Sequence, residues 1–277
     1  MGVPYAEVIG DPIAHSKSPL IHKFWLRKLG LAGDYRAVRC SANRLPGYLA
    51  GRCADPFWRG CNVTAPLKRE AISLAADPTD FCARVGAANA IFRSPLGCGV
   101  AANTDVLGAA AVLDGIWGSG TRACIIGAGG AARALMHFIE AWPPAAASLV
   151  VRDVARGKRV LKDFQISGGV YPFDACEEAL SGADLVINAS PLGMTGMPSM
   201  PEPVLDRLAE TEHEALIIDL VYSPLDTVLL RRARGLGRKT EDGITMLVAQ
   251  AAPAFELFFG AKAPREHDAE LRALLTS

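Results

Sequence analysis

Short apolar runs alternate along this chain with longer stretches in which apolar and polar positions recur at helical spacing. The runs at residues 122–126, 148–153, 184–188 and 215–219 have the length and composition of buried strands. Longer amphipathic stretches separate them. This alternation is typical of a parallel sheet whose faces are covered by helices, so the pattern predicts an α/β fold.

The strand-like runs also suggest a division of the chain into two domains. The first hundred residues contain strand candidates of their own at 5–9 and 60–64, which is enough for a separate small domain. A helix-like stretch at 246–259 follows the last apolar strand and is expected to return to that first domain. We therefore predict a substrate domain at residues 1–104 and 240–277, and a dinucleotide-binding domain of the Rossmann type at 105–239.

Composition and charge narrow the class of protein. The chain has 277 residues, of which 50% are hydrophobic, so it can bury a sizeable core. Lysine plus arginine total 29 and aspartate plus glutamate total 29, so there is no net basic field for nucleic acid or anionic lipid. No window reaches the ~18 apolar residues of a spanning helix, and no signal-like start is present. We expect a cytoplasmic protein without nucleic-acid or membrane partners.

Seven cysteines are scattered through the sequence without any pairing pattern. Their number is odd, none forms a C-x-x-C pair, and no histidine lies at metal-ligand spacing from them. We expect reduced thiols, as in cytosolic proteins, and no metal site.

A glycine-rich turn follows the predicted strand 122–126 and opens a helix-like stretch. Gly127, Gly129 and Ala132 fit the dinucleotide fingerprint, in which the first glycine makes the turn and the second lets a pyrophosphate approach the backbone. The helix start supplies free N–H groups to the phosphates. The turn therefore predicts a bound dinucleotide.

The end of the next strand normally selects between NAD and NADP, and here the signals conflict. Arg152 and Arg156 suit a ribose 2′-phosphate, whereas Asp153 suits a 2′-hydroxyl and repels a phosphate. Each of the three is otherwise an ordinary surface charge. Two arginines against one aspartate favour NADP, and NAD stays open.

Four short polar clusters interrupt the apolar first domain, at residues 15–19, 62–68, 86–90 and 103–105. Taken singly, each is typical of a turn or a helix cap, and the last would simply start a helix at 106–113. Together they offer hydroxyls, amides, one lysine and one aspartate. Such a set suits the hydrogen bonds of a small, sugar-like acid.

Lys68 and Asp105 in these clusters can carry a reaction. Oxidation of a secondary alcohol needs a hydride acceptor and a group that removes the hydroxyl proton. A buried lysine can act as that base or stabilise an alkoxide, and a neighbouring carboxylate can orient it. The alternative is an ordinary salt bridge. His15 is interpreted as a structural residue or as one that supports a site residue without touching the substrate.

These motifs resemble, in order and spacing, those of the shikimate dehydrogenase family, and the resemblance covers nearly the whole chain, residues 10–260. It implies two α/β domains with a cleft between them, the substrate domain being built from both ends of the chain. It also implies reversible NADPH-dependent reduction of 3-dehydroshikimate to shikimate, an oxidoreductase step of the chorismate pathway in aromatic amino acid biosynthesis.

The resemblance assigns roles to residues at matching motif positions. It implies that the catalytic pair is Lys68 and Asp105. The implied substrate-binding residues are Ser16, Ser18, Thr64, Asn89, Tyr222 and Gln250. The implied cofactor-binding residues are Gly127, Ala128, Gly129, Gly130, Ala131, Arg152, Asp153, Arg156, Ser190, Leu220, Gly243 and Met246.

One departure from the family pattern keeps alternatives open. The family loop that binds NADP usually reads Asn-Arg-Thr followed by a basic residue, whereas here Val151, Arg152 and Asp153 precede Arg156. The alternatives are an NAD-dependent quinate/shikimate dehydrogenase, an amino-shikimate relative, or a non-catalytic ligand-binding paralogue. Monomer and homodimer both stay open.

Overall fold

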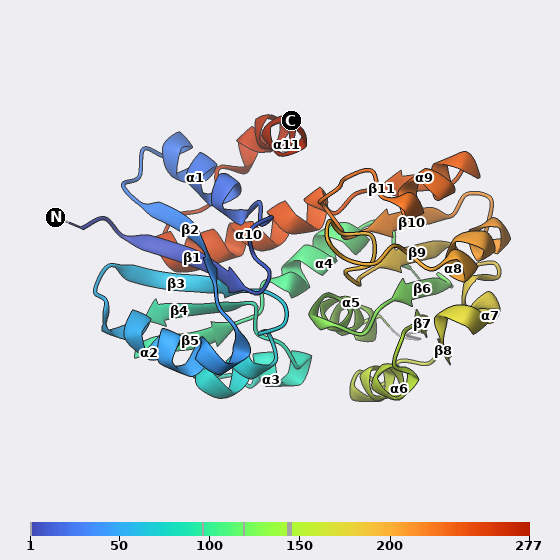
Figure 1. Ribbon diagram of the computed structural model, residues 1–277, viewed down its shortest axis with the longest axis horizontal. Coiled ribbons are helices and arrows are strands. Elements are labelled where there is room, and N and C mark those ends of the chain that lie inside the picture. The colour runs from blue at the N-terminus through green and yellow to red at the C-terminus, as the bar shows by residue number, and fades with distance from the viewer. Residues whose placement is uncertain (1, 96, 119, 143–145) are drawn as a thin grey trace. The chain divides into compact units, whose positions relative to one another are not determined.

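The computed structural model describes residues 2–95, 97–118, 120–142 and 146–277, and the chain forms two compact units (Figure 1). Unit 1 contains Met1–Leu107 and Val248–Ser277, and unit 2 contains Gly108–Leu247. The chain leaves unit 1 within helix α4 (Asp105–Leu113) and returns within helix α10 (Ile244–Phe259). The first crossing lies three residues beyond the predicted boundary at 104, and the second lies eight residues beyond the boundary at 239.

Unit 1 is built on a five-stranded sheet in the order β2-β1-β3-β4-β5. β1 is parallel to β2 and β3, whereas β4 is antiparallel to β3 and β5. The α/β class is confirmed, although this sheet is mixed where the pattern predicted a parallel one, because β4 and β5 form a hairpin. The strands are β1 (Tyr5–Gly10), β2 (Asp34–Arg39), β3 (Trp58–Val63), β4 (Ala90–Ser94) and β5 (Gly97–Ala102).

The strand directions bring the predicted polar clusters of unit 1 to one edge of the sheet. β1, β3 and β5 end at this edge, and β4 begins there because it runs the opposite way. In the register, Asn62 lies beside Ala90, which lies beside Ala102. The segments that follow β1, β3 and β5, and the residue that precedes β4, therefore lie at one edge.

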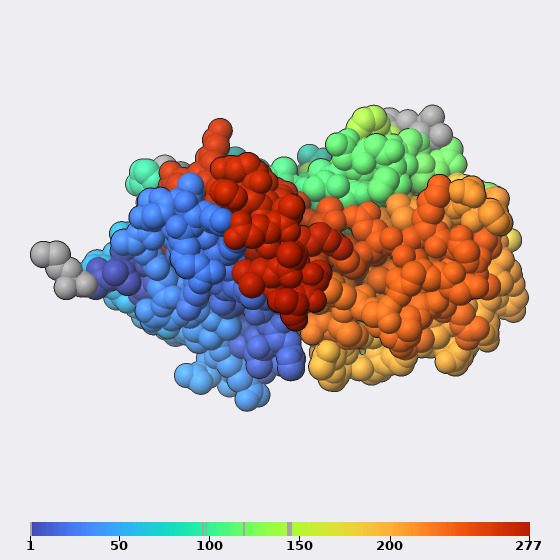
Figure 2. All heavy atoms as spheres, turned by 90° about the horizontal axis from the view of Figure 1, so that it is seen from above, coloured from blue at the N-terminus to red at the C-terminus, as the bar shows by residue number. Residues whose placement is uncertain are grey.

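Helices cover both faces of this sheet. On β1, Tyr5 and Ile9 pack with residues of α2, whereas Ala6 and Val8 pack with residues of α10. Figure 2 shows the C-terminal residues of unit 1 lying against its N-terminal residues. The helices are α1 (Ser18–Lys28), α2 (Leu45–Ala54), α3 (Phe81–Val85), α10 and α11 (Asp268–Thr276), with 3-10 turns at Ala42–Arg44, Glu70–Leu74 and Arg265–His267.

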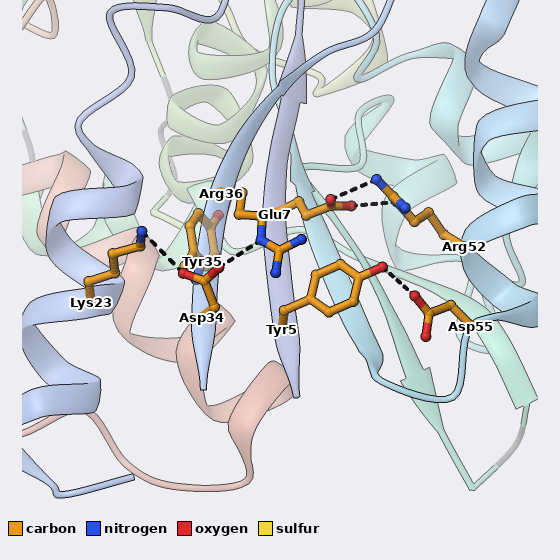
Figure 3. A network of polar contacts seen from close by, with 8 residues as sticks. All are labelled: Tyr5, Glu7, Lys23, Asp34, Tyr35, Arg36, Arg52 and Asp55. Atoms are coloured by element: carbon orange, nitrogen blue, oxygen red, sulfur yellow. Dashed lines mark hydrogen bonds and ion pairs between the residues drawn. The ribbon is translucent and has the colours of Figure 1, made fainter. Parts of the chain in front are cut away.

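A buried ion pair fixes α2 to the sheet (Figure 3). Glu7 on β1 is fully buried, and both of its carboxylate oxygens accept hydrogen bonds of 2.9 Å from Arg52 of α2. The Tyr48 hydroxyl donates to the same carboxylate. Because a buried charge is stable only when it is paired and hydrogen-bonded, this contact fixes how α2 sits on β1.

Unit 2 contains six parallel strands in the order β11-β10-β9-β6-β7-β8. Read from the β8 edge and counted from the first strand of the unit, this is the order 3-2-1-4-5-6 of dinucleotide-binding sheets. The order reverses between β6 and β9, and ligands of such sheets bind at that point, beyond the carboxyl ends of the strands. The strands are β6 (Ala123–Ile126), β7 (Ala147–Val150), β8 (Val170–Tyr171), β9 (Leu185–Asn188), β10 (Leu216–Asp219) and β11 (Lys239–Glu241).

Apolar side chains of β6, β9 and β10 pack with helices α7, α8 and α9 on one face of this sheet. Helices α5 and α6 lie on the other face (Figure 1). The helices are α5 (Gly130–Glu140), α6 (Val154–Asp163), α7 (Glu177–Leu180), α8 (Glu202–Arg207) and α9 (Val228–Gly235), with 3-10 turns at Phe173–Ala175 and Leu208–Glu210. Among the described residues, no helix is long and apolar enough to span a membrane.

The cysteines depart in part from the expectation of reduced thiols. Five are free and buried: Cys40, Cys61, Cys82, Cys124 and Cys176. Burial raises the pKa of the Cys82 thiol to about 12. Cys53, in contrast, is disulfide-bonded, so the expectation is wrong at that position.

Candidate active site

The centre of the site in unit 1 is an ion pair between Lys68 and Asp105. Nζ of Lys68 lies 2.5 Å from Oδ2 of Asp105. Lys68 lies in the segment that follows β3, and Asp105 is the first residue of α4, where the helix dipole favours a negative charge. The Asp105 side chain is 7% exposed and that of Lys68 is 21% exposed, so the pair is largely shielded from solvent.

Asn89 holds the other side of the Asp105 carboxylate. Its Nδ2 donates to Asp105 Oδ1 at 2.9 Å and to Thr104 Oγ1 at 2.8 Å. Its Oδ1 accepts the main-chain N–H of Thr104 at 2.6 Å. Gln250 of α10 lies beside the same amide, with its Oε1 3.4 Å from Asn89 Nδ2. The carboxylate is therefore fixed at both oxygens, by Lys68 and by Asn89.

The predicted hydroxyl residues lie in the segments that follow β1 and β3. Ser16 Oγ accepts the main-chain N–H of Ser18 at 3.3 Å, and Ser18 is the buried first residue of α1. Thr64 directly follows β3, and its N–H donates to Ile9 O at 2.9 Å. Between the two serines, Lys17 Nζ donates to the carbonyl of Leu275 in the C-terminal helix. The structure thus places the serine loop and Thr64 at the edge that carries Lys68.

The alternative of plain helix caps fits these clusters only in part. Asp105 does begin α4. Ser18, however, is not the N-cap of α1. Lys17 occupies that position, and its side chain makes no capping hydrogen bond.

The sequence did not predict a role for Tyr35, and it offered Asn62 and Thr104 only as members of the polar clusters 62–68 and 103–105. All three are buried. Asn62 and Thr104 each adjoin a predicted site residue, which is a usable signal, whereas Tyr35 lies in an edge strand that the pattern did not predict.

The glycine turn of unit 2 follows β6 at the point where the strand order reverses. Gly127 has a φ of +115°, and a Cβ there would lie 3.1 Å from main-chain atoms of Ala189 and from Cβ of Ser190. The turn therefore packs directly on the segment after β9, and only glycine fits without strain. A Cβ on Gly129 would meet nothing within 4 Å, so space is open beside the start of α5 at Gly130. A pyrophosphate fits such a place.

A buried polar network shapes the segments after β9 and β10. Asn188 Nδ2 donates to Asp219 Oδ1 at 2.8 Å, and the Thr227 hydroxyl donates to Asp219 Oδ2 at 2.7 Å. Ser190 donates its hydroxyl and its N–H to Asn188 Oδ1. Burial raises the pKa of the fully buried Asp219, although its hydrogen bonds oppose that shift. The network fixes Ser190 beside the glycine turn.

Other residues predicted to bind the cofactor or the substrate lie in the segments that follow β10 and β11. The Leu220 N–H donates to Asn188 O at 3.0 Å. A Cβ on Gly243 would lie 2.3 Å from Leu220 O, so glycine is needed there for close packing. Met246 is buried in the first turns of α10, and Tyr222 is half-buried in the segment after β10. The roles of these residues stay predictions.

The three charged residues after β7 are exposed. Asp153 is the N-cap of α6, and its Oδ1 accepts the N–H of Arg156 at 2.9 Å. Its carboxylate therefore has a local structural role, independent of any ribose.

The two units together define a class of protein. Unit 2 has the strand order and the glycine turn of a dinucleotide-binding sheet, and unit 1 presents a shielded lysine–aspartate pair among amides and hydroxyls. Among the described residues, no group of three or more histidine, cysteine or acidic side chains is placed to hold a metal ion. This combination is that of a nucleotide-dependent oxidoreductase.

Comparison with known proteins gives the family. The model of the shikimate dehydrogenase substrate binding domain matches residues 8–91, and that of the shikimate 5'-dehydrogenase C-terminal domain matches 243–270. The shikimate dehydrogenase (NADP(+)) of Sphingopyxis alaskensis is 46% identical over 99% of this chain and 97% of its own.

Solved structures of shikimate dehydrogenases are similar to this chain along nearly its whole length. A shikimate 5-dehydrogenase from Thermus thermophilus, in complex with NADP(H) and shikimate, has a TM-score of 0.81 and 30% identity over 99% of this chain and 100% of its own. One from Listeria monocytogenes, in complex with shikimate and NAD, has a TM-score of 0.81 and 26% identity over 98% and 96%. This chain belongs to the shikimate dehydrogenase family. The predicted family and fold class are confirmed, whereas the oligomeric state and cytoplasmic location stay predictions.

Proposed function

We propose that this protein catalyses the reversible reduction of 3-dehydroshikimate to shikimate with NADPH. The observation that carries the proposal is the shielded contact of 2.5 Å between Lys68 and Asp105, with Asn89 fixing the second carboxylate oxygen. The relatives from Sphingopyxis alaskensis and Brucella abortus are both named shikimate dehydrogenase (NADP(+)), which agrees with this proposal.

The roles of the substrate residues follow from their chemistry. Ser16 and Ser18 supply hydroxyl donors for the carboxylate of the acid. Thr64, Asn89 and Gln250 supply donors and acceptors for ring hydroxyls, which need both. Tyr222 adds a phenolic hydroxyl.

The proton is handled by the ion pair. When bound, NADPH supplies the hydride that reduces the carbonyl carbon. Lys68 donates a proton from Nζ to the carbonyl oxygen, so that the ketone gains one hydride and one proton and becomes a secondary alcohol. Asp105 holds the ammonium group in place and balances its charge. In the oxidation the step runs in reverse, and the amine form of Lys68 takes the proton back from the hydroxyl.

The residues of unit 2 fit a dinucleotide with a 2′-phosphate. The open space at Gly129 and the start of α5 suit the pyrophosphate, and Arg152 and Arg156 suit the 2′-phosphate. Threonine, which the family pattern has in place of Asp153, is also a good helix cap. The aspartate therefore keeps the local role of the threonine and adds a negative charge.

The test is an absorbance assay at a wavelength specific to reduced nicotinamide, with shikimate and quinate each crossed against NADP and NAD. Fast oxidation of shikimate with NADP alone is the expected result. Preference for NAD or quinate would replace the proposal with a quinate/shikimate dehydrogenase. Substrate binding by calorimetry without turnover would identify a non-catalytic paralogue.

A further inference from the structure

A line of buried hydrogen bonds leads from the edge strand β2 to the candidate site within unit 1. The hydroxyl of Tyr35, on β2, donates to Asn62 Oδ1 at 2.6 Å. Nδ2 of Asn62, on β3, donates to the main-chain carbonyl of Asn89 at 3.2 Å. Tyr35 is fully buried, and Asn62 and Asn89 are 7% and 2% exposed. Through Asn89 the line reaches the Asp105 carboxylate.

The direction of these bonds is fixed by chemistry. The Asn89 carbonyl can only accept, so the amide of Asn62 must turn its Nδ2 toward it. Oδ1 of Asn62 then faces Tyr35, and since an amide oxygen can only accept, the tyrosine hydroxyl must donate. Tyr35 is thus the donor that holds the Asn62 amide in the orientation that Asn89 requires.

The ring of Tyr35 is itself held tightly. His22 of α1 stacks on it with 4.0 Å between ring centroids and 4° between planes, and Phe258 of α10 packs against it. His22 is fully buried, and neither of its ring nitrogens has a hydrogen-bond partner among the described residues. The imidazole therefore serves as a flat packing surface, and the hydroxyl of Tyr35 is fixed in position.

We propose that Tyr35 is a positioning residue for the reaction. Acting through Asn62, it adds a side-chain hydrogen bond to the Asn89 carbonyl, which also accepts the N–H of Val63 at 2.7 Å. It thereby helps to hold the segment at Asn89, and so the Asp105 carboxylate, opposite Lys68. This role rests on the proposed function. It predicts that the hydroxyl matters for the chemical step and little for substrate affinity.

The test is the kinetics of Tyr35→Phe, which keeps the ring and removes the hydroxyl. Loss of the donor leaves Asn62 Oδ1 buried without its partner, so kcat should fall about tenfold while KM for shikimate changes less than about twofold.

Tyr5→Phe is the matched control. Tyr5 lies on the adjacent strand β1 (Figure 3), and its hydroxyl also makes a hydrogen bond of 2.6 Å, to Asp55. Tyr5 is opposite Asp34 in the register and Tyr35 is opposite Ala6, so the two side chains point to opposite faces of the sheet. Tyr5→Phe should keep the wild-type kcat.

A double-mutant cycle separates positioning from general stability. If Tyr35 acts through Asn62, Tyr35→Phe should have no further effect on kcat in an Asn62→Ala background. Equal kcat values for Tyr35→Phe and Tyr5→Phe, or additive effects of Tyr35→Phe and Asn62→Ala, would overturn the role. If Tyr35→Phe does not fold, Asn62→Ser tests the same link and should lower kcat without raising KM. If the wild-type protein did not oxidise shikimate, the proposed function itself would be overturned, and the role of Tyr35 would fall with it.

Discussion

The carboxylate of Asp153 accepts the main-chain N–H of Arg156 at 2.9 Å and so caps helix α6. One residue therefore combines a favourable local bond with a negative charge beside the two arginines proposed for the 2′-phosphate. The conflict between these signals in the sequence follows from this double role. Substitutions of Asp153 that keep or remove the helix cap can separate its capping role from the effect of its charge on the cofactor.

Asp153→Thr should lower KM for NADP about fivefold, because it removes a charge that repels the phosphate and keeps a capping hydroxyl. KM for NAD should rise or stay the same. Asp153→Ala should improve NADP binding as well but lower the free energy of unfolding by about 1 kcal/mol, because the cap is lost. Steady-state kinetics with both cofactors and urea denaturation measure the two effects. Unchanged NADP kinetics in both variants would place Asp153 away from the phosphate.

Arg152→Ala should have the opposite effect and raise KM for NADP far more than for NAD, since a guanidinium group pairs with the phosphate that NAD lacks. The same assay with both cofactors tests this. Equal changes for the two cofactors would assign Arg152 to the surface.

Gly127→Ala and Gly129→Ala should fail in different ways. At Gly127 a Cβ would meet Ala189 and Ser190 at 3.1 Å in a left-handed conformation, so the variant should unfold at lower temperature. At Gly129 the Cβ would enter open space, so the melting temperature without cofactor should stay the same while NADP binding weakens at least about tenfold. Calorimetry and NADP titration measure these effects. Normal NADP affinity in Gly129→Ala would move the pyrophosphate elsewhere.

Lys68→Ala should lower kcat about a thousandfold, because it removes the proposed proton donor. Shikimate affinity should stay within about tenfold of the wild type, since the loss is mainly of transition-state stabilisation. Steady-state kinetics measure the change in kcat, and isothermal titration calorimetry measures the change in shikimate affinity. Weak binding with normal turnover at saturation would make Lys68 a substrate-binding residue only.

His22→Phe should change the pH dependence of stability. Burial lowers the pKa of His22 from 6.5 to about 3, so the folded protein keeps the ring neutral where the unfolded chain takes up a proton. This contribution to stability is complete above pH 6.5 and is lost as the pH falls toward 3, by about 1.4 kcal/mol per pH unit.

The stability of His22→Phe relative to wild type should therefore increase as the pH falls below 6.5, measured by urea denaturation between about pH 7 and 5. The control is Trp25→Phe in the same aromatic cluster, because an indole does not titrate in this range. A constant difference between His22→Phe and wild type would show that the imidazole titrates normally.

Local patterns were sufficient for much of this fold. The alternation of apolar runs predicted strands at β1, β3, β6, β7, β9 and β10 because each run is largely buried on both faces and has few polar breaks. The edge strand β2 was missed, since only one side chain of its six residues is buried and its pattern is that of a surface segment.

The sequence by itself determined the α/β class, the glycine turn and the set of chemical groups, because these depend on residue type and spacing along a few turns of chain. Tertiary structure alone brought Lys68 to 2.5 Å from Asp105, and Asn89 between Asp105 and Gln250. These contacts join residues from 16 to 161 positions apart, and they depend on the antiparallel course of β4 and on the return of α10. The line of hydrogen bonds from Tyr35 to Asn89 was likewise decided by tertiary structure, because strand register and packing bring Tyr35, Asn62 and Asn89 together. The cap at Asp153, in contrast, is a local bond to the N–H of Arg156, three residues further along the chain.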